Sequence, residues 1–428
     1  MQYRAAKGMN DILPDEVRRW NRVETAFRRI VALHGYGEVR TPLLEPTELF
    51  VRSVGEATDM VQKEMFTFQH HDDSLTLRPE GTASAARAYI EHGVQAKEPV
   101  SRWFYIGPMF RAERPQRGRY RQFYQAGCEI FGDGGPASDA EMIDMLFRFF
   151  RDLGISDVNV LVNSLGDTNA RERYREALRQ HLSPRRDELS EASQRRLNDN
   201  PLRILDSKNP KDQELVRDAP PILELLSDED RAHFDGLRRN LDALGVPYRV
   251  EPRLVRGLDY YTRTLFEIQS GAGNLGAQNA LGGGGRYDAM IRELGGPVVP
   301  ALGFAIGLER VLLALGESAV PPPSPVFVAP IGEHAATEGL VLARDLRERG
   351  VVVDFDGRGN SMKSMLRRAN AVGARLCVIL GDAELDRGVV KVKDLTGHAE
   401  EELPRAAVVD AIVARVFGEK SGPAEEPR

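Results

Sequence analysis

Five arginines lie within eleven residues of this chain, and their chemistry suits an anionic partner. They are Arg111, Arg114, Arg117, Arg119 and Arg121. A guanidinium group is permanently charged and presents planar pairs of N–H donors, a geometry that matches phosphate oxygens. Apolar, strand-like runs flank the cluster, so the segment 103–132 indicates a β-hairpin with a cationic loop. The pattern predicts a phosphate-binding hairpin.

The strand that follows this loop carries further chemically useful side chains. Successive side chains of a strand point to opposite faces, so one face carries Phe123, Gln125, Gly127 and Glu129. The intervening positions are apolar and predict the core face. An aromatic ring, an amide, a gap and a carboxylate in one row would suit an organic ligand lying across the sheet. The alternation alone also fits an antiparallel strand with one solvated face.

Three peptides in and around this region resemble the motifs of the class II aminoacyl-tRNA synthetases. Residues 107–115 (GPMFRAERP) resemble motif 2, whose first arginine holds the α-phosphate of ATP. Residues 303–310 (GFAIGLER) resemble motif 3, at a family-like separation from motif 2. Residues 40–45 (RTPLLE) resemble motif 1, an element of the dimer interface, although this peptide is weak on its own.

Two further peptides narrow the resemblance. Residues 256–262 (RGLDYYT) and 283–288 (GGGRYD) are similar to the two signature peptides of the histidyl-tRNA synthetases, and the likeness covers roughly residues 1 to 418. The resemblance implies a ligase with two steps. The enzyme would activate L-histidine with ATP to histidyl-adenylate and transfer histidine to the 3′-terminal ribose of tRNA(His).

The resemblance also implies an ATP site. Arg111, Arg256 and Arg310 would converge on the phosphates, with Arg111 and Arg256 as the catalytic pair. Negative charge redistributes around phosphorus as the transition state forms, and fixed cations can stabilise that change. The further residues assigned to ATP are Glu113 on the adenine side, Arg119, Arg121 and Phe123. Each arginine can also be explained as an exposed surface residue.

Histidine would be recognised largely through its ring. A neutral imidazole offers one donor and one acceptor, so Glu129 would accept a ring N–H while Tyr260 and Tyr261 supply hydroxyls and flat walls. A site that demands a hydrogen bond rejects analogues more strongly than an apolar pocket does. The competing explanation is that both tyrosines are half-buried strand residues.

The charged ends of histidine would be held by other residues. The turn at 79–82 would hold the α-ammonium, and the carboxylate would meet Gln125 and Arg256. The residues assigned here are Glu80, Gly81, Thr82, Arg111, Gln125 and Arg256. The plain alternative is that this turn only caps the helix that follows it.

Backbone geometry constrains the second half of the site. Strict alternation would place Arg256 and Tyr261 on opposite faces, so we expect a bulge or turn at Gly257. The glycine run 282–285 permits close backbone approach to a ligand. Residues 271–276 (GAGNLG) fit GxGxxG, but no long helix follows, so we expect a loop. No segment fits GxxxxGK[ST], which leaves a P-loop fold unsupported.

Composition indicates an ordinary soluble protein, and a cytoplasmic location is expected by default. The chain of 428 residues is 42% apolar and 29% charged, contains no apolar run of the ~18 residues that a membrane span needs, and begins without an apolar signal segment. Its net charge of −6 gives no general attraction to nucleic acid. An RNA site must therefore be a local basic patch, either the arginine hairpin or the basic residues within 363–375, which a solvated helix face explains equally well.

No protein metal site is expected. Cys128 and Cys377 lie far apart in apolar runs and predict reduced core thiols. None of the eight histidines forms a ligand-spaced cluster, and His70 with His71 predicts a loop pair. Mg²⁺ would accompany ATP, bound mainly through the phosphates.

The order of predicted elements indicates an α+β protein. Residues 1–322 predict a class II antiparallel-sheet catalytic domain with a helical insertion at about 167–245. A proline-rich run at 320–325 indicates a linker. Residues 323–418 predict a three-layer α/β domain that resembles the anticodon-binding domain, and 419–428 a flexible tail. The resemblance implies a homodimer with no membrane association.

Two rival functions share part of the pattern. One is a non-catalytic relative resembling the regulatory subunit of ATP phosphoribosyltransferase, but such relatives lack the anticodon-binding domain and typically depart from the arginine peptide. The other is a synthetase for another amino acid, against which the peptides at 256 and 283 argue.

Overall fold

The computed structural model of the chain describes residues 3–56, 58–272, 275, 279–316, 324–359 and 361–418. The chain forms two compact units, Met1–Ala319 and Val320–Arg428. Most of the proline-rich linker, part of the GAGNLG loop and the tail predicted at 419–428 lie outside the described residues. The predicted boundary at 322/323 therefore stays a prediction.

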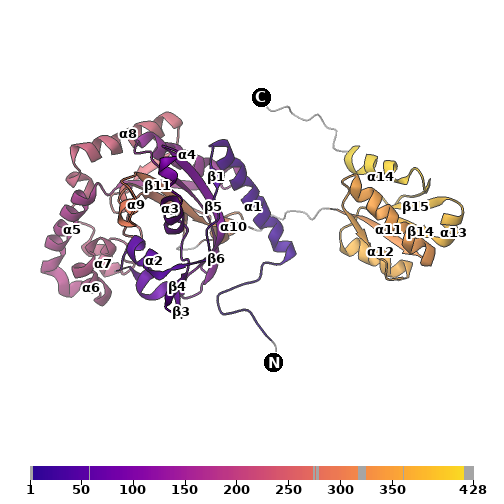
Figure 1. Cartoon of the computed structure of the whole chain (residues 1–428), viewed down its shortest axis with the longest axis horizontal. Coiled ribbons are helices and arrows are strands. Elements are labelled where there is room, and N and C mark those ends of the chain that lie inside the picture. Colours follow the sequence, from indigo (N-terminus) through magenta and orange to yellow (C-terminus); the bar gives the residue numbers. More distant parts are fainter. Residues whose placement is uncertain are drawn as a thin grey trace. The chain divides into compact units, whose positions relative to one another are not determined.

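A large sheet forms the centre of the N-terminal unit (Figure 1). Its strands are β1 (Gly37–Glu38), β5 (Ser101–Phe110), β6 (Gln122–Phe131), β7 (Val158–Ser164), β8 (Tyr248–Val250), β9 (Thr262–Ser270), β10 (Ala280–Arg286) and β11 (Ala301–Gly307). Among the described residues their order is β1-β5-β6-β11-β10-β9-β7-β8. The pairs are antiparallel except β1 with β5 and β7 with β8. The predicted antiparallel-sheet α+β class is confirmed.

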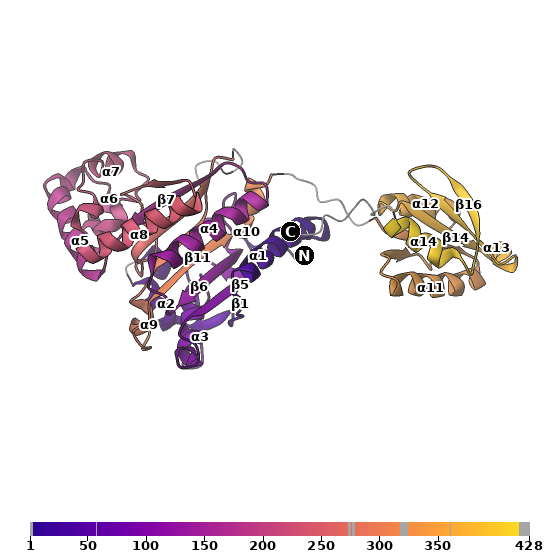
Figure 2. The same cartoon turned by 90° about the horizontal axis from the view of Figure 1, so that it is seen from above.

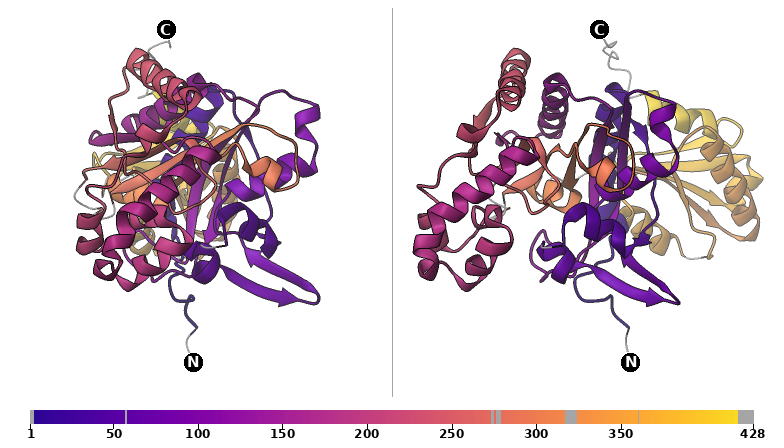
Figure 3. Two further views of the ribbon diagram at one scale, coloured as in Figure 1. Left: turned by 90° about the vertical axis from the view of Figure 1, so that its left-hand side faces the viewer. Right: turned by 60° about the vertical axis from the view of Figure 1, so that its left-hand side comes forward.

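Helices and a smaller sheet surround this sheet. A second sheet has the order β2-β4-β3, and its β3–β4 hairpin projects from the unit (Figure 3). The elements are α1 (Pro14–Leu33), β2 (Leu44–Pro46), α2 (Thr47–Val54), the π-helix η1 (Met60–Glu64), β3 (Phe66–His70), β4 (Asp73–Leu77), α3 (Thr82–Glu91), η2 (Val94–Ala96), α4 (Pro136–Asp152), α9 (Met290–Glu293) and α10 (Leu308–Ala314).

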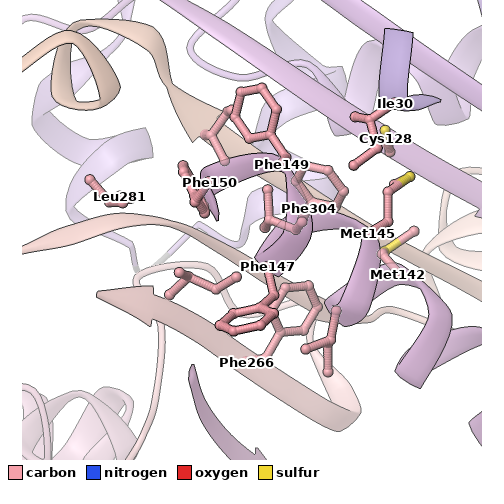
Figure 4. Close-up of a cluster of buried hydrophobic side chains, with 14 of the residues drawn as sticks. Ile30, Cys128, Met142, Met145, Phe147, Phe149, Phe150, Phe266, Leu281 and Phe304 are labelled. Carbon is pink, nitrogen blue, oxygen red and sulfur yellow. The ribbon is translucent and has the colours of Figure 1, made fainter. Parts of the chain in front are cut away.

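The main apolar core lies between one face of the large sheet and helices α1 and α4. Phe149 of α4 gathers there with Phe266 of β9 and Phe304 of β11 (Figure 4). The alternate residues of β6 that were predicted to face the core, including Cys128, belong to this cluster. Full burial of one such side chain stabilises a fold by ~1.5–3 kcal/mol. Burial of one set of β6 side chains in this core therefore directs the alternate set to the opposite face of the sheet.

Helices fill the segment in which the sequence predicts an insertion. They are α5 (Thr168–Leu182), η3 (Ser183–Glu188), α6 (Glu191–Asp199), η4 (Pro201–Ile204), α7 (Pro210–Leu215), η5 (Ile222–Leu225) and α8 (Asp228–Leu244). Asp167, Ser190 and Ser227 cap α5, α6 and α8 by accepting the backbone N–H three residues ahead. The chain leaves the sheet after β7 and returns to it at β8, so the insertion lies beside the parallel β7–β8 edge.

A buried ion pair joins β10 to the helices behind the sheet. Arg286 is fully buried and its Nη2 lies 2.5 Å from an oxygen of Asp139 on α4. His233 of α8 contacts the other oxygen of Asp139 at 2.8 Å. Arg286 in the GGGRYD peptide therefore has a structural contact, whereas the next residue, Tyr287, lines the cavity described below.

The C-terminal unit is a three-layer α/β domain, as predicted. Its mixed sheet has the order β13-β12-β14-β15-β16. Helix α12 covers one face, and α11 and α14 cover the other (Figure 2). The elements are β12 (Val326–Ile331), α11 (Glu333–Glu348), β13 (Val353–Phe355), α12 (Met362–Ala371), β14 (Leu376–Gly381), α13 (Asp382–Asp386), β15 (Val389–Asp394), β16 (Glu400–Pro404) and α14 (Val408–Phe417).

The cysteines and the longest apolar helices can be described for both units. Cys128 and Cys377 are buried free thiols, as predicted. Across the part of the chain that the structure describes, no helix is both long and apolar enough to cross a membrane.

Candidate active site

A cavity lies on the large sheet where segments distant in the sequence meet. Its walls come from the β4–α3 turn, the β5–β6 hairpin, the loop before β9, the glycine strand β10, and β11 with the start of α10. The lining residues are Glu80, Thr82, Arg111, Glu113, Gly118, Arg119, Tyr120, Phe123, Gln125, Arg256, Leu258, Tyr260, Tyr261, Leu281, Gly282, Gly283, Tyr287, Gly303, Phe304, Ala305, Gly307, Glu309 and Arg310.

Four arginines share this cavity. Arg111 and Arg119 come from the hairpin, Arg256 from the loop before β9, and Arg310 from the first turn of α10. Burial, followed by repulsion from Arg119 and Arg111, lowers the pKa of Arg310 to about 10. A cluster in which cations repel one another favours binding of a polyanion. The gathering that the sequence predicts for Arg111, Arg256 and Arg310 is present.

Arg111 is fixed in place by contacts on two sides. It follows the last residue of β5, and its Nε donates to the carbonyl of Pro79 at 2.9 Å. Its guanidinium carbon lies 5.1 Å from the centre of the Phe123 ring, within the range of a cation–π contact. Glu113 pairs with Arg119 at 2.9 Å, so the hairpin loop carries a carboxylate beside its cations.

Arg256 lies in an irregular loop rather than a strand. A bend occurs at Gly257 and a turn at 259–260 before β9 starts at Thr262, so the expected change of direction is confirmed. The Nη1 of Arg256 lies 3.1 Å from Glu267 Oε2. A Cβ at position 283 would lie 2.4 Å from that Nη1. Glycine at this position therefore leaves the space through which the guanidinium passes.

Arg310 and Glu309 line the cavity from the start of α10. Arg310 Nη1 donates to the carbonyl of Ala280 at 3.0 Å. Glu309 accepts the backbone N–H of Tyr124 at 3.0 Å, and burial raises its pKa to about 7. Sequence reasoning missed Glu309, for which the only signal was its place within the motif 3 peptide.

Glu80 both caps a helix and lines the cavity. Its oxygens accept the backbone N–H groups of Thr82 and Ala83, each at 2.8 Å, which caps α3. Glu80 also lines the cavity, and burial raises its pKa. Gly81 does not line the cavity, but a Cβ there would lie 2.3 Å from the ring of Tyr105, so glycine leaves the room that this ring occupies.

Glu129 lies behind the cavity wall in a cage of hydroxyl groups. One oxygen accepts from Thr82 at 2.7 Å and from Tyr105 at 3.2 Å, and the other accepts from Tyr287. Its carboxyl group has no exposed surface. Burial raises the pKa of Glu129 to about 8, and the hydroxyl donors oppose this rise only in part. Of the donors, sequence reasoning missed Tyr105, which lies opposite Gly127 in the β5–β6 register.

Both tyrosines of the RGLDYYT peptide line the cavity. Tyr260 and Tyr261 precede β9, so they are not the half-buried strand residues of the alternative explanation. Their ring centres are 4.6 Å apart, and that of Tyr260 is 5.6 Å from Tyr287. The three rings form an aromatic wall beside Thr82 and Gln125.

The structure leaves several predicted residues outside the cavity. Besides Gly81 and Glu129, Arg121 is not among the lining residues. Its backbone N–H donates to Gly8 at 2.7 Å and its Nε to the carbonyl of Glu113 at 3.3 Å. Arg114 and Arg117 are exposed on the hairpin loop.

Metal ligands do not cluster here. Within the described residues, no group of three or more His, Cys, Asp or Glu side chains is placed to hold a metal ion. The ring centres of His70 and His71 are 4.4 Å apart at the end of β3.

Comparisons with known proteins agree with this geometry. The sequence profile described as histidyl-tRNA synthetase matches residues 8–311, and that of the anticodon binding domain matches 325–415. The chain is 62% identical over 418 residues to a histidine–tRNA ligase of Sorangium cellulosum, which covers 97% of both chains. It is 45% identical to that of Syntrophotalea carbinolica, covering 98% of this chain and 100% of the relative. An apo histidyl-tRNA synthetase structure from S. aureus has a TM-score of 0.81 at 34% identity and covers 96% of this chain and 100% of that chain.

The buried carboxyl of Glu129 makes stability depend on pH. The folded chain keeps this proton up to a pKa of about 8, whereas an unfolded glutamate loses it near ~4.3. The stability gained from this group is therefore complete below about pH 4 and is lost as pH rises toward 8. Relative to Glu129→Gln, the free energy of unfolding of the wild-type chain should fall by about 1.4 kcal/mol per pH unit between these values.

Urea unfolding at several pH values measures this difference. Trp20 and Trp103 are the two tryptophans and both lie in the N-terminal unit, so their fluorescence reports on the unit that holds Glu129. A difference between the two proteins that does not change with pH would place the pKa of Glu129 in its ordinary range and contradict the prediction.

Proposed function

The chain belongs to the histidyl-tRNA synthetase family, and from this premise we infer its reaction. It activates L-histidine with ATP to histidyl-adenylate and transfers histidine to the 3′-terminal ribose of tRNA(His). The observation that supports this most directly is the cavity in which four arginines lie beside an aromatic wall and a caged carboxyl group.

We propose that Arg111 and Arg256 stabilise the first chemical step. The histidine carboxylate attacks the α-phosphorus of ATP, an O–P bond forms, and the bond to pyrophosphate breaks. Negative charge moves toward the pyrophosphate and the equatorial oxygens, where preorganised guanidinium groups lower the barrier. Arg310 and Arg119 contact the remaining phosphates, because both line the same cavity. In the second step a ribose hydroxyl attacks the acyl carbon and AMP leaves.

The nucleotide base is proposed to lie against the hairpin. Phe123 offers a ring face next to Arg111, and Glu113 lies at the loop side of the cavity. Mg²⁺ enters with ATP as part of the substrate complex and is held mainly by the phosphates. Arg121, which packs toward Gly8, reaches the nucleotide only if the hairpin loop moves.

Histidine is proposed to bind between the aromatic wall and the β4–α3 turn. Its α-ammonium contacts Glu80 and Thr82, and its carboxylate contacts Gln125 and Arg256. The ring N–H donates to Glu129, whose ionised carboxylate offers about four acceptor sites, three of which are used by the hydroxyl donors. Because Glu129 does not line the cavity, the side chains in front of it shift to admit this contact. Tyr260 and Tyr261 supply the flat walls.

Three further features complete the proposal. The C-terminal unit, where the anticodon-domain profile matches, contacts tRNA. The chain is a homodimer, because the motif 1 peptide lies next to the edge strand β1 and leaves Leu43 and Leu44 43% and 41% exposed. The protein acts in the cytoplasm.

ATP–pyrophosphate exchange measured with each of the twenty amino acids tests the proposed reaction. Exchange should depend on histidine alone. A synthetase for another substrate would respond to a different amino acid, and a non-catalytic regulatory relative would show no exchange.

Arg256→Ala should slow adenylate formation by ~100- to 1000-fold, the range for removal of one preorganised electrostatic donor. Arg249→Ala is the matched control, since Arg249 lies seven residues upstream with a side chain 69% exposed, and should retain activity. A normal exchange rate in Arg256→Ala would remove this residue from the mechanism.

Glu129→Gln should raise the KM for histidine by roughly 10- to 100-fold, because a hydrogen bond to a charged group contributes ~1.5–3 kcal/mol. The KM for ATP should change little. The assay should be run at a pH above the Glu129 pKa of about 8, where the wild-type carboxyl is ionised. Equal increases in both KM values would show that the variant disturbs the whole cavity instead of the ring contact.

A further inference from the structure

The loop that carries Arg256 is held from outside by the helical insertion. Residues 251–261 form no regular element, so their carbonyls lack the regular partners that a strand or helix would provide. Arg171 of α5 donates from Nη1 to the carbonyl of Tyr261 at 2.9 Å and from Nη2 to that of Asp259 at 2.8 Å. One insertion side chain therefore spans the end of the loop at which β9 starts.

A second part of the insertion holds the bend. Arg203 of η4 donates to the carbonyl of Gly257, the residue after Arg256, at 2.8 Å. Asn200, just before η4, donates to the side chain of Asp259 at 2.8 Å. The backbone on the C-terminal side of Arg256 is thus held by α5 and by η4 with the residue before it.

The insertion also reaches the segment beside Arg111. Asp59 accepts from Arg196 at 3.1 Å and from Arg203 at 3.5 Å. Asp59 precedes η1, whose last residue, Glu64, accepts the backbone N–H of Ala112 at 2.7 Å. The same helical segment therefore contacts the backbone supports of both catalytic arginines.

The contacts of Arg171 should stabilise the loop strongly, because this side chain is largely buried. Burial lowers the pKa of its guanidinium, and its Nε has no hydrogen-bond partner among the described residues. A desolvated cation that leaves one donor unpaired stays in place only if its remaining donors are well used. The two carbonyl contacts to the Arg256 loop meet that need.

We propose that the helical insertion positions Arg256 for adenylate formation, with Arg171 and Arg203 as positioning residues that act through it. The inference rests on the role of Arg256 proposed above. A preorganised donor stabilises a transition state only while it is held in the productive geometry. The insertion therefore contributes to amino-acid activation itself, before any tRNA is bound.

Pyrophosphate exchange without tRNA tests this in a double-mutant cycle of Arg171→Met and Arg256→Ala. Methionine keeps the apolar stem and removes both donors. In the wild-type background Arg171→Met should lower kcat by roughly 10- to 100-fold, the effect of losing two hydrogen bonds to the loop. KM should change less than kcat. In the Arg256→Ala background the same substitution should lower kcat less than about twofold, because residues that act as a unit are not additive.

Arg173→Met is the control, because Arg173 lies on the same helix but donates to Leu225 within the insertion, at 2.8 Å. It should retain full exchange. Thermal unfolding of each variant checks the fold, and Arg203→Met provides the same cycle if Arg171→Met does not fold.

Two results separate the inference from the function on which it rests. If Arg171→Met lowers kcat by the same factor with and without Arg256, or has no effect, the positioning role is wrong while the function stands. If Arg256→Ala alone retains full activity, the assigned role of Arg256 fails first.

Discussion

The structure depends on holding several like charges close together in one cavity. Guanidinium groups that share a cavity repel one another, and each needs a fixed acceptor nearby. Arg111 and Arg310 donate to backbone carbonyls, while Arg119 and Arg256 contact glutamates. Two of these acceptors, Pro79 and Glu113, lie more than a hundred residues before the other two, Glu267 and Ala280, so only the complete sheet brings all four together. Site and fold therefore depend on one another.

Glycines in the sheet make this density of side chains possible. At Gly283 a Cβ would collide with Arg256, and at Gly303 it would lie 1.7 Å from a Glu129 oxygen. At Gly127 it would lie 2.5 Å from Tyr105. Strand glycines weaken a sheet locally. Here, however, Gly283 and Gly127 both lie opposite Ala305, and the antiparallel pairing of β11 with β10 and β6 continues without a register shift. The backbone hydrogen bonds of the antiparallel sheet keep these strands rigid although the glycines have no side chains to pack.

Elements with a strong local pattern could be predicted from the sequence. The hairpin around the arginine cluster follows from the apolar, strand-like runs that flank it, and the buried face of β6 follows from the alternation of its residues. Strand β16 could not be predicted, because its exposed, acidic residues (EEELP) show no apolar alternation. The enclosure of Glu129 and the turning of Arg121 toward Gly8 also escaped prediction. Both depend on side chains from distant segments, which local spacing does not encode, and the same holds for the support that the insertion gives to Arg256.

The most direct test of the account is a crystal structure of the chain with histidine and a non-hydrolysable ATP analogue. We expect the α-phosphate within hydrogen-bonding distance of both Arg111 and Arg256, with the imidazole ring against the tyrosine wall and directed toward Glu129. A nucleotide bound outside this cavity, or one whose α-phosphate contacts neither arginine, would contradict it.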